Sequence, residues 1–193
     1  MRLFVVAVLV VLVSGCASQP SNIDDVCVVF DENGGWFNNW HRQAKKAEKE
    51  FGVPVPVIMA TIWKESAFVA NARPPRTRLL GVIPWKRPSD AYGYAQALKS
   101  TWRWYQDSTG RGGADRNDFG DAAHFVGWYH YQSWQKNGIA RNDAYRLYLA
   151  YYSGHGGYAR GTWQGNSWVK QAAQRVAAQS ERYRAQMARC GRL

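Results

Sequence analysis

Apolar residues recur every three to four positions over most of this chain, which is the spacing of helices that bury one face. The first such helix is predicted over residues 36–51 and ends before Gly52. Pro54 and Pro56 open a second helix, which we expect to end near Asn71. Later helices are predicted from about Leu98 and over 121–136, 142–152 and 167–189.

Two segments break this helical spacing. Residues 73–88 alternate five basic residues with four prolines, and residues 107–120 are rich in Gly and Asp, so both are predicted loops. No series of alternating strands appears, although a small hairpin is compatible with the segment 81–95. The pattern therefore predicts a mainly α fold in a single domain.

The N-terminus has the layout of an export signal. Arg2 precedes the apolar run Leu3–Val13, and Ser14-Gly15-Cys16 follows. The run is shorter than the ~20 residues that a membrane-spanning helix needs. Leu12-Val13-Ser14-Gly15-Cys16 resembles the bacterial lipobox, which implies cleavage after residue 15 and a lipid on Cys16; the alternative is an ordinary secretory signal with a chance cysteine. Ala17-Ser18 lacks the aspartate that tends to hold such lipoproteins at the inner membrane, so the resemblance implies an outer-membrane anchor that faces the periplasm.

Residues 16–34 are polar and predict a tether, which leaves residues 35–190 as the folded domain. Besides Cys16 the chain has two cysteines, Cys27 and Cys190. An exported protein can join them in a disulfide, and two free thiols are the alternative. No CxxC or paired His/Cys spacing predicts a metal site.

The formal net charge of +11 is open to three interpretations. The charge alone would suit a protein that binds nucleic acid, but the export signal argues against this interpretation. An acidic polymer of the cell envelope fits the charge and the compartment, and a solubilising surface is the third interpretation. The sequence identifies no protein partner.

Glu65 is the strongest candidate for chemistry. It is the only glutamate between Glu50 and Glu181, and on a helix Ile62, Phe68 and Val69 would surround it with apolar side chains. Such a setting raises the pKa of a carboxyl, as a general acid requires. The alternative is an ordinary surface glutamate at a helix end.

Two further patches follow Glu65. In Gly93-Tyr94-Ala95-Gln96 the glycine permits close backbone approach, and the glutamine amide can both donate to and accept from a sugar or an acetamido group. Ala150-Tyr151-Tyr152-Ser153-Gly154 places a phenol at a helix end followed by glycines. A turn before a helix and a helix C-cap explain the two patches equally well.

Taken in order, the three patches resemble the motifs of the lysozyme-like lytic transglycosylases, the Slt-type domain of glycoside hydrolase family 23. The family pattern is Glu-Ser, then Ser-x-x-x-Gly-Leu-Met-Gln, then Ala-Tyr-Asn-x-Gly. The corresponding segments here are Glu65-Ser66, Ser89–Gln96 and Ala150–Gly154. The resemblance covers about residues 45–180 and implies a lysozyme-like fold.

The resemblance also implies roles for individual residues. Glu65 would be the single catalytic acid and base, Ser66 would support it by a hydrogen bond, and Tyr151 would orient it. Substrate-binding positions would be Gly93, Gln96 and the backbone of Tyr94 and Ala95. Tyr152 replaces the family's asparagine, Tyr94-Ala95 replaces Leu-Met, and Trp168 stands where a tyrosine is usual.

The resemblance implies cleavage of the β-1,4 bond between N-acetylmuramic acid and N-acetylglucosamine in peptidoglycan strands, with a 1,6-anhydro product and no cofactor. A hydrolytic muramidase is one rival and would need a second carboxylate, for which Asp90 is the only one embedded in a motif. A non-catalytic lipoprotein that binds peptidoglycan is the other.

Overall fold

Seven helices and one short hairpin make up the part of the chain that the computed structural model describes, residues 19–36, 38–79, 83–84 and 86–193. The expected signal segment 1–15 and Cys16 lie outside these residues. The helices are α1 (Val26–Glu32), α2 (Trp40–Phe51), α3 (Val55–Ser66), α4 (Lys99–Thr109), α5 (Phe119–Asn137), α6 (Ala144–Ala159) and α7 (Ser167–Arg189). The expected mainly α domain is therefore confirmed.

Helix α5 is the centre of the domain, because it is buried on nearly all sides over residues 122–130. It packs against α2, α3, α4 and α6. Gly127 allows the closest of these contacts, since a Cβ there would lie 3.0 Å from the Phe51 ring. At the start of α5, Phe119 stacks on Trp40 of α2 with ring centroids 4.0 Å apart.

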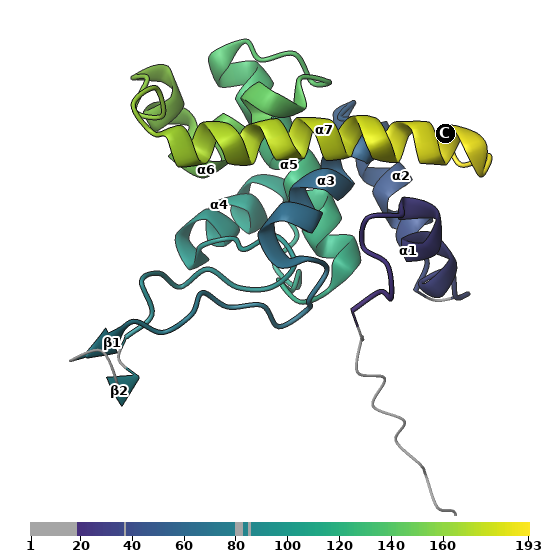
Figure 1. Ribbon diagram of the computed structural model, residues 1–193, viewed down its shortest axis with the longest axis horizontal. Coiled ribbons are helices and arrows are strands. Elements are labelled where there is room, and N and C mark those ends of the chain that lie inside the picture. Colours follow the sequence, from purple (N-terminus) through teal and green to yellow (C-terminus); the bar gives the residue numbers. More distant parts are fainter. Residues whose placement is uncertain (1–18, 37, 80–82, 85) are drawn as a thin grey trace, which may run out of the picture.

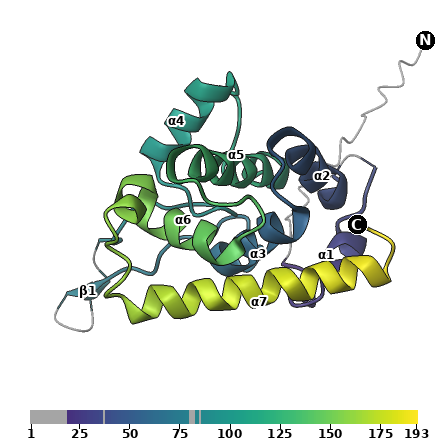
Figure 2. The ribbon, with the colours of Figure 1, turned by 90° about the horizontal axis from the view of Figure 1, so that it is seen from above.

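Helix α7 runs along one face of the molecule from end to end (Figures 1 and 2). It packs against α3 and α6, and its C-terminal part meets α1. A disulfide joins Cys27 of α1 to Cys190, the residue after α7, and confirms the expected pairing. Because 163 residues separate the two cysteines, the bond links the two ends of the domain.

The segment expected to be a tether is packed on the domain from Gln19 onward. Val26, Val29 and Phe30, at helical spacing, are buried and form the inner face of α1. Ahead of α1, the Ile23 carbonyl accepts a hydrogen bond from Tyr183, and the Gln19 amide donates to the Ala67 carbonyl at 2.9 Å. The tether prediction is wrong for these residues, because a helix of seven residues gives too short a pattern to recognise.

Several helix ends also differ from the prediction. The first helix begins at Trp40 rather than Trp36, because the Asn39 side chain caps it by accepting from the Arg42 N–H; the Trp36 side chain is 85% exposed. Helix α3 ends at Ser66, because the next two residues turn into the left-handed region. Helix α6 continues to Ala159 through a non-helical residue, Gly154.

The hairpin lies earlier than expected. Strands β1 (Arg78–Leu79) and β2 (Ile83–Pro84) pair antiparallel at the tip of the proline-rich loop, which projects from the helical body (Figure 1). No helix in the described part of the chain is long and apolar enough to cross a membrane.

Candidate active site

A groove runs past Glu65 in both directions. It consists of two adjoining cavities, of about 520 and 760 Å³, and Glu65, Gln96 and Tyr152 line both of them. Among the described residues Glu65 is the only charged one that lines the smaller cavity, which is called the neutral half below. The larger one is lined by Lys64 and Arg73 as well and is called the cationic half.

Glu65 lies in the last turn of α3, where the helix ends against the groove. The end is enforced by Ala67 and Phe68, which have φ of 50° and 61°, a conformation that non-glycine residues rarely adopt. Phe68 is fully buried against Trp40, with ring centroids 5.8 Å apart. The packing of the Phe68 ring therefore stabilises the left-handed turn that ends α3 directly after Glu65 and Ser66.

The environment of Glu65 suits a general acid. Its side chain is half-buried, and this desolvation raises its pKa from 4.5 to about 7. A hydrogen bond from the Tyr148 hydroxyl and the positive charge of Lys64 oppose the rise in pKa. A carboxyl with a pKa near 7 holds a proton in a large part of the molecules at neutral pH and can donate it.

The protein behind Glu65 is polar but uncharged. Thr61, one turn earlier on α3, bonds through Oγ1 to Nε2 of His130 at 3.0 Å and donates to the Val57 carbonyl. Burial lowers the pKa of His130 to about 3, so its imidazole is neutral. His130 therefore adds no positive charge that would counteract the rise in the pKa of Glu65.

The role expected of Tyr151 is taken by another tyrosine of α6, for which the sequence predicted no role. Tyr151 lies beside Glu65, but its hydroxyl donates to the Ala95 carbonyl at 2.5 Å. The hydrogen bond to Glu65 comes instead from Tyr148, one helical turn earlier. Tyr148 was missed because its motif begins only at Ala150; the spacing of 148, 151 and 152 on one helix face was the available signal.

Gln96 lines the groove, as expected, but its amide N–H groups are already used. They donate to the carbonyls of Ala72 and Gly93 at 2.9 and 2.8 Å. Its φ is +46°, so the side chain and backbone together form a tight turn. The amide oxygen of Gln96 is the part left for a ligand.

Gly93 and Tyr94 form the support of the groove rather than its lining. A Cβ on Gly93, whose φ is +79°, would lie 1.9 Å from the Arg116 carbonyl oxygen, so its close approach is to protein. The Tyr94 ring is buried edge-on against Trp40 at 5.5 Å, and its backbone N–H donates to Arg116. Ala95 is also fully buried and contributes its carbonyl to Tyr151. None of the three lines either cavity.

Ser66 and Tyr152 both reach the groove. The Ser66 hydroxyl donates to the Ile62 carbonyl within α3 at 3.2 Å, so its bond stabilises the helix end and not the carboxyl. Tyr152 is half exposed and lies 5.4 Å from Trp168, ring to ring. Trp168, at the start of α7, thereby joins Tyr152 in an aromatic face suited to stacking on a sugar ring.

Glu65 is the only carboxylate in the lining of the groove as far as the described residues go. Asp90, the candidate second carboxylate, is exposed and accepts from the Lys99 N–H at 3.3 Å, outside both linings. Among the described residues, no group of three His, Cys, Asp or Glu side chains is placed to hold a metal ion.

The sequence profile of one family, the transglycosylase SLT domain, matches residues 4–190, which is nearly the whole chain. No curated protein matches the sequence of this chain. The profile spans α1 to α7, and therefore the acid, both halves of the groove and the disulfide. As the order of its three motifs indicated, this chain belongs to the transglycosylase SLT domain family, and its domain is a lytic transglycosylase domain of the Slt type.

Proposed function

We propose that this protein cleaves the β-1,4 bond between N-acetylmuramic acid and N-acetylglucosamine in peptidoglycan and leaves a 1,6-anhydro end on the muramic acid. Family membership supports transglycosylase activity on peptidoglycan in general. The observation that carries the finer proposal is the single half-buried carboxyl, Glu65, at the middle of a groove open to both sides.

The reaction needs one acid that becomes a base. The Glu65 carboxyl gives its proton to the glycosidic oxygen as the bond to C1 of the muramic acid breaks. The neighbouring acetamido group stabilises the charge that develops at C1. The C6 hydroxyl of the same sugar then attacks C1 and gives its proton to the Glu65 carboxylate, which returns to its starting state. The attack is intramolecular, so no water needs to be positioned.

The lining of the groove argues against hydrolysis by two carboxylates. Glycosidases that invert or retain configuration place a second carboxyl within about 5–10 Å of the first, across the scissile bond. In the described residues the groove offers Glu65 alone, and Asp90 is occupied with the N–H of Lys99. This distribution supports the anhydro product over a free reducing end.

Mass spectrometry of digested sacculi tests the proposal. The wild type is expected to release muropeptides with anhydro ends, and Glu65→Gln to lower the rate by about 10²–10⁴-fold, the usual contribution of a general acid. Free reducing ends would favour a hydrolytic muramidase. Undiminished release by a folded Glu65→Gln variant would contradict the assignment of the acid, and no release by either protein would favour a binding lipoprotein.

We also propose that a lipid on Cys16 holds the protein at the outer membrane, facing the periplasm. The support is the lipobox-like sequence Leu12–Cys16, and the absence of an aspartate from the two positions directly after it, Ala17 and Ser18. Labelling of cells with a radioactive fatty acid should mark the wild type and not Cys16→Ala. Equal labelling of both, or of neither, would contradict the anchor.

A further inference from the structure

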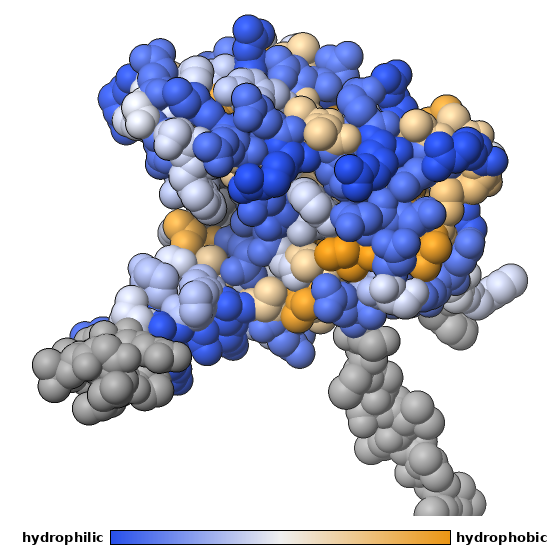
Figure 3. All heavy atoms as spheres, viewed as in Figure 1, coloured by the Kyte–Doolittle hydropathy of each residue, from blue (hydrophilic) through white to orange (hydrophobic). Residues whose placement is uncertain are grey.

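The proline-rich loop forms an arm, defined here as residues 72–91, that stands away from the helical body beside the groove (Figure 1). Its base belongs to the cationic half, because Arg73, Pro74, Pro75 and Pro88 line that cavity. Figure 3 shows the hollow between arm and body on this side of the molecule. A group that leaves the groove at this end therefore passes along the arm.

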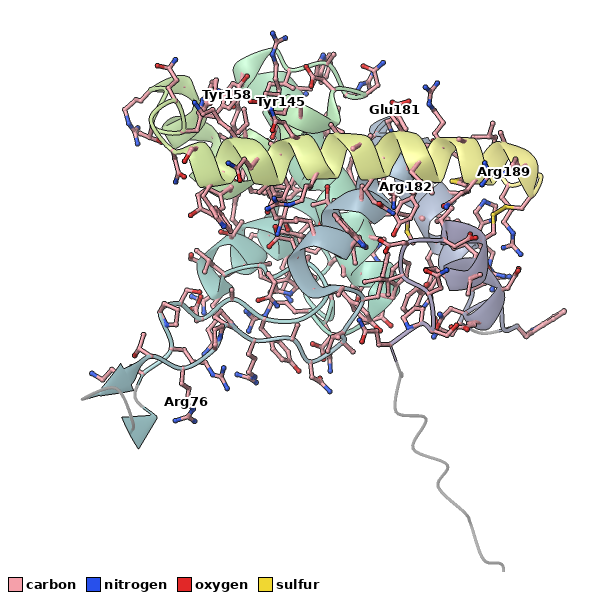
Figure 4. The ribbon with its side chains drawn as sticks, viewed as in Figure 1. Arg76, Tyr145, Tyr158, Glu181, Arg182 and Arg189 are labelled. Atoms are coloured by element: carbon pink, nitrogen blue, oxygen red, sulfur yellow. A yellow bond between two sulfur atoms is a disulfide. The ribbon has the colours of Figure 1, made fainter. Side chains whose placement is uncertain are left out.

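The arm carries positive charge without compensation. From Ser66 to Ser89 the sequence contains five arginines and lysines and no carboxylate. Arg76 and Lys86 are exposed, and no ion pair reaches them from the described residues. Figure 4 shows Arg76 pointing outward from the arm. Elsewhere arginines such as Arg111 and Arg192 are paired with aspartates.

Arg73 connects this charge to the groove. Its guanidinium lies over the Tyr92 ring at 4.4 Å, which fixes its position while its N–H groups stay unused by the described residues. Lys64 lines the same cavity, with its ammonium 5.7 Å from the Trp168 ring centroid. Two fixed cations therefore face the cationic half, and further cations continue along the arm.

The sugars that would occupy the groove are uncharged, since the lactyl carboxyl of muramic acid is joined to a peptide by an amide bond. The anionic groups of the proposed substrate are the free carboxylates of that peptide. The peptide extends away from the glycan, as the arm extends away from the groove.

We infer that Arg73, Arg76 and Lys86 form a subsite for the carboxylates of the stem peptides, so that the enzyme selects peptide-bearing glycan. This inference rests on the proposed function. It concerns the peptide part of the substrate, whereas Glu65 acts on the glycan. Its strength is that of exposed ion pairs, which together change affinity about three- to tenfold and weaken with salt.

Binding measured without cleavage tests the subsite separately from the reaction. The protein is Glu65→Gln, and the probes are soluble, uncross-linked strands with stem peptides, either native or with their carboxylates converted to carboxamides. We expect the native strands to bind about three- to tenfold more tightly at low salt. Adding Arg76→Gln and Lys86→Gln should remove most of the preference, with Arg73 retained, and leave binding of the amidated strands unchanged.

The matched control removes two positive charges from the far side of the domain. Arg182 and Arg189 lie on α7, well away from the arm (Figure 4). Arg182→Gln with Arg189→Gln, in the Glu65→Gln protein, should keep the full preference. Equal binding of native and amidated strands would overturn the inference, and so would an equal loss of preference in the arm and control variants. A failure of the proposed reaction would appear instead as absent anhydro products from the wild type.

Discussion

The two halves of the groove are built differently. The neutral half is lined in part by side chains of α5 and α6, such as Phe125, Tyr129 and Tyr151, which belong to the packed core or rest directly on it. The cationic half is lined largely by the end of α3, the arm and the first residues of α7. Glu65 lies where the two meet.

This difference separates rigidity from recognition. A carboxyl keeps a raised pKa only if its surroundings stay dry and fixed, and the core helices provide such surroundings. Loop residues such as Arg73 can vary without disturbing that core, so they are suited to selecting the substrate. Changes in the neutral half should therefore affect turnover or stability. Changes in the cationic half should affect binding, except at Glu65 and at Tyr148, which bonds to it.

The largest effect should come from pH, through the residue that both halves share. Glu65 must start protonated, and burial raises its pKa to about 7. Well below that pH kcat/KM should be level, and well above it kcat/KM should fall about tenfold per pH unit, which gives about a 50-fold fall between pH 7 and 9. Initial rates on soluble strands measure this; a level profile up to pH 9 would show that Glu65 is not the acid.

The same shift predicts a change in stability. Because the folded protein holds the Glu65 proton up to about pH 7 and the unfolded chain only to about 4.5, the stability contributed by the protonated form is lost as pH rises through this window. Glu65→Gln should therefore raise the free energy of unfolding at pH 8 by about 2 kcal/mol, allowing for partial solvation, and leave it nearly unchanged at pH 4.

The next largest effect should come from a substitution that strains the backbone of the neutral half and lowers the stability of the fold. Gly154 has φ 70° and ψ 157°, a region that only glycine occupies readily, and it lines this half. Gly154→Ala should cost about 2 kcal/mol in denaturant unfolding, although open space surrounds its Cβ position. Gly165→Ala, also in open space but without a positive φ, is the control and should cost well under 1 kcal/mol.

Tyr148→Phe should lower kcat by roughly tenfold, because the hydroxyl that orients Glu65 is lost. The pKa of Glu65 should also rise, since that hydrogen bond lowers it, so the alkaline limb of the pH profile should move to higher pH. Tyr145→Phe, one turn earlier on α6, is the control (Figure 4). An unmoved pH profile would reduce Tyr148 to a packing role.

Trp168→Ala should have the smallest effect, and it should act on KM rather than on kcat. Loss of the aromatic face with Tyr152 should raise KM about fivefold and change kcat less than twofold. Trp134 is the control, because it is exposed and lies against Arg141 at 4.8 Å but lines neither cavity. A large fall in kcat for Trp168→Ala would erase the distinction between the two halves.

Features encoded locally were predictable from the sequence. Helix α7, the position of Glu65 on a helix and the pairing of Cys27 with Cys190 follow from the periodicity and from the presence of only two cysteines besides Cys16. Features set by distant contacts were not. Tyr94 turns into the core because Trp40 and Phe119 meet it there, and Gln96 turns back on Ala72, which is 24 residues earlier. Sequence spacing contains no information on either contact.

The hydrogen bond from Gln19 to Ala67 holds the N-terminal segment two residues along the chain from Glu65. Only two residues lie between Cys16 and Gln19, so the two positions can be at most about 10 Å apart in a fully extended chain. With the proposed lipid on Cys16, the groove would work within a nanometre or two of the bilayer. The length of the segment between Cys16 and Gln19 would then limit how far from the membrane the enzyme can act. A flexible insertion before Gln19 would let it reach glycan strands farther from the membrane.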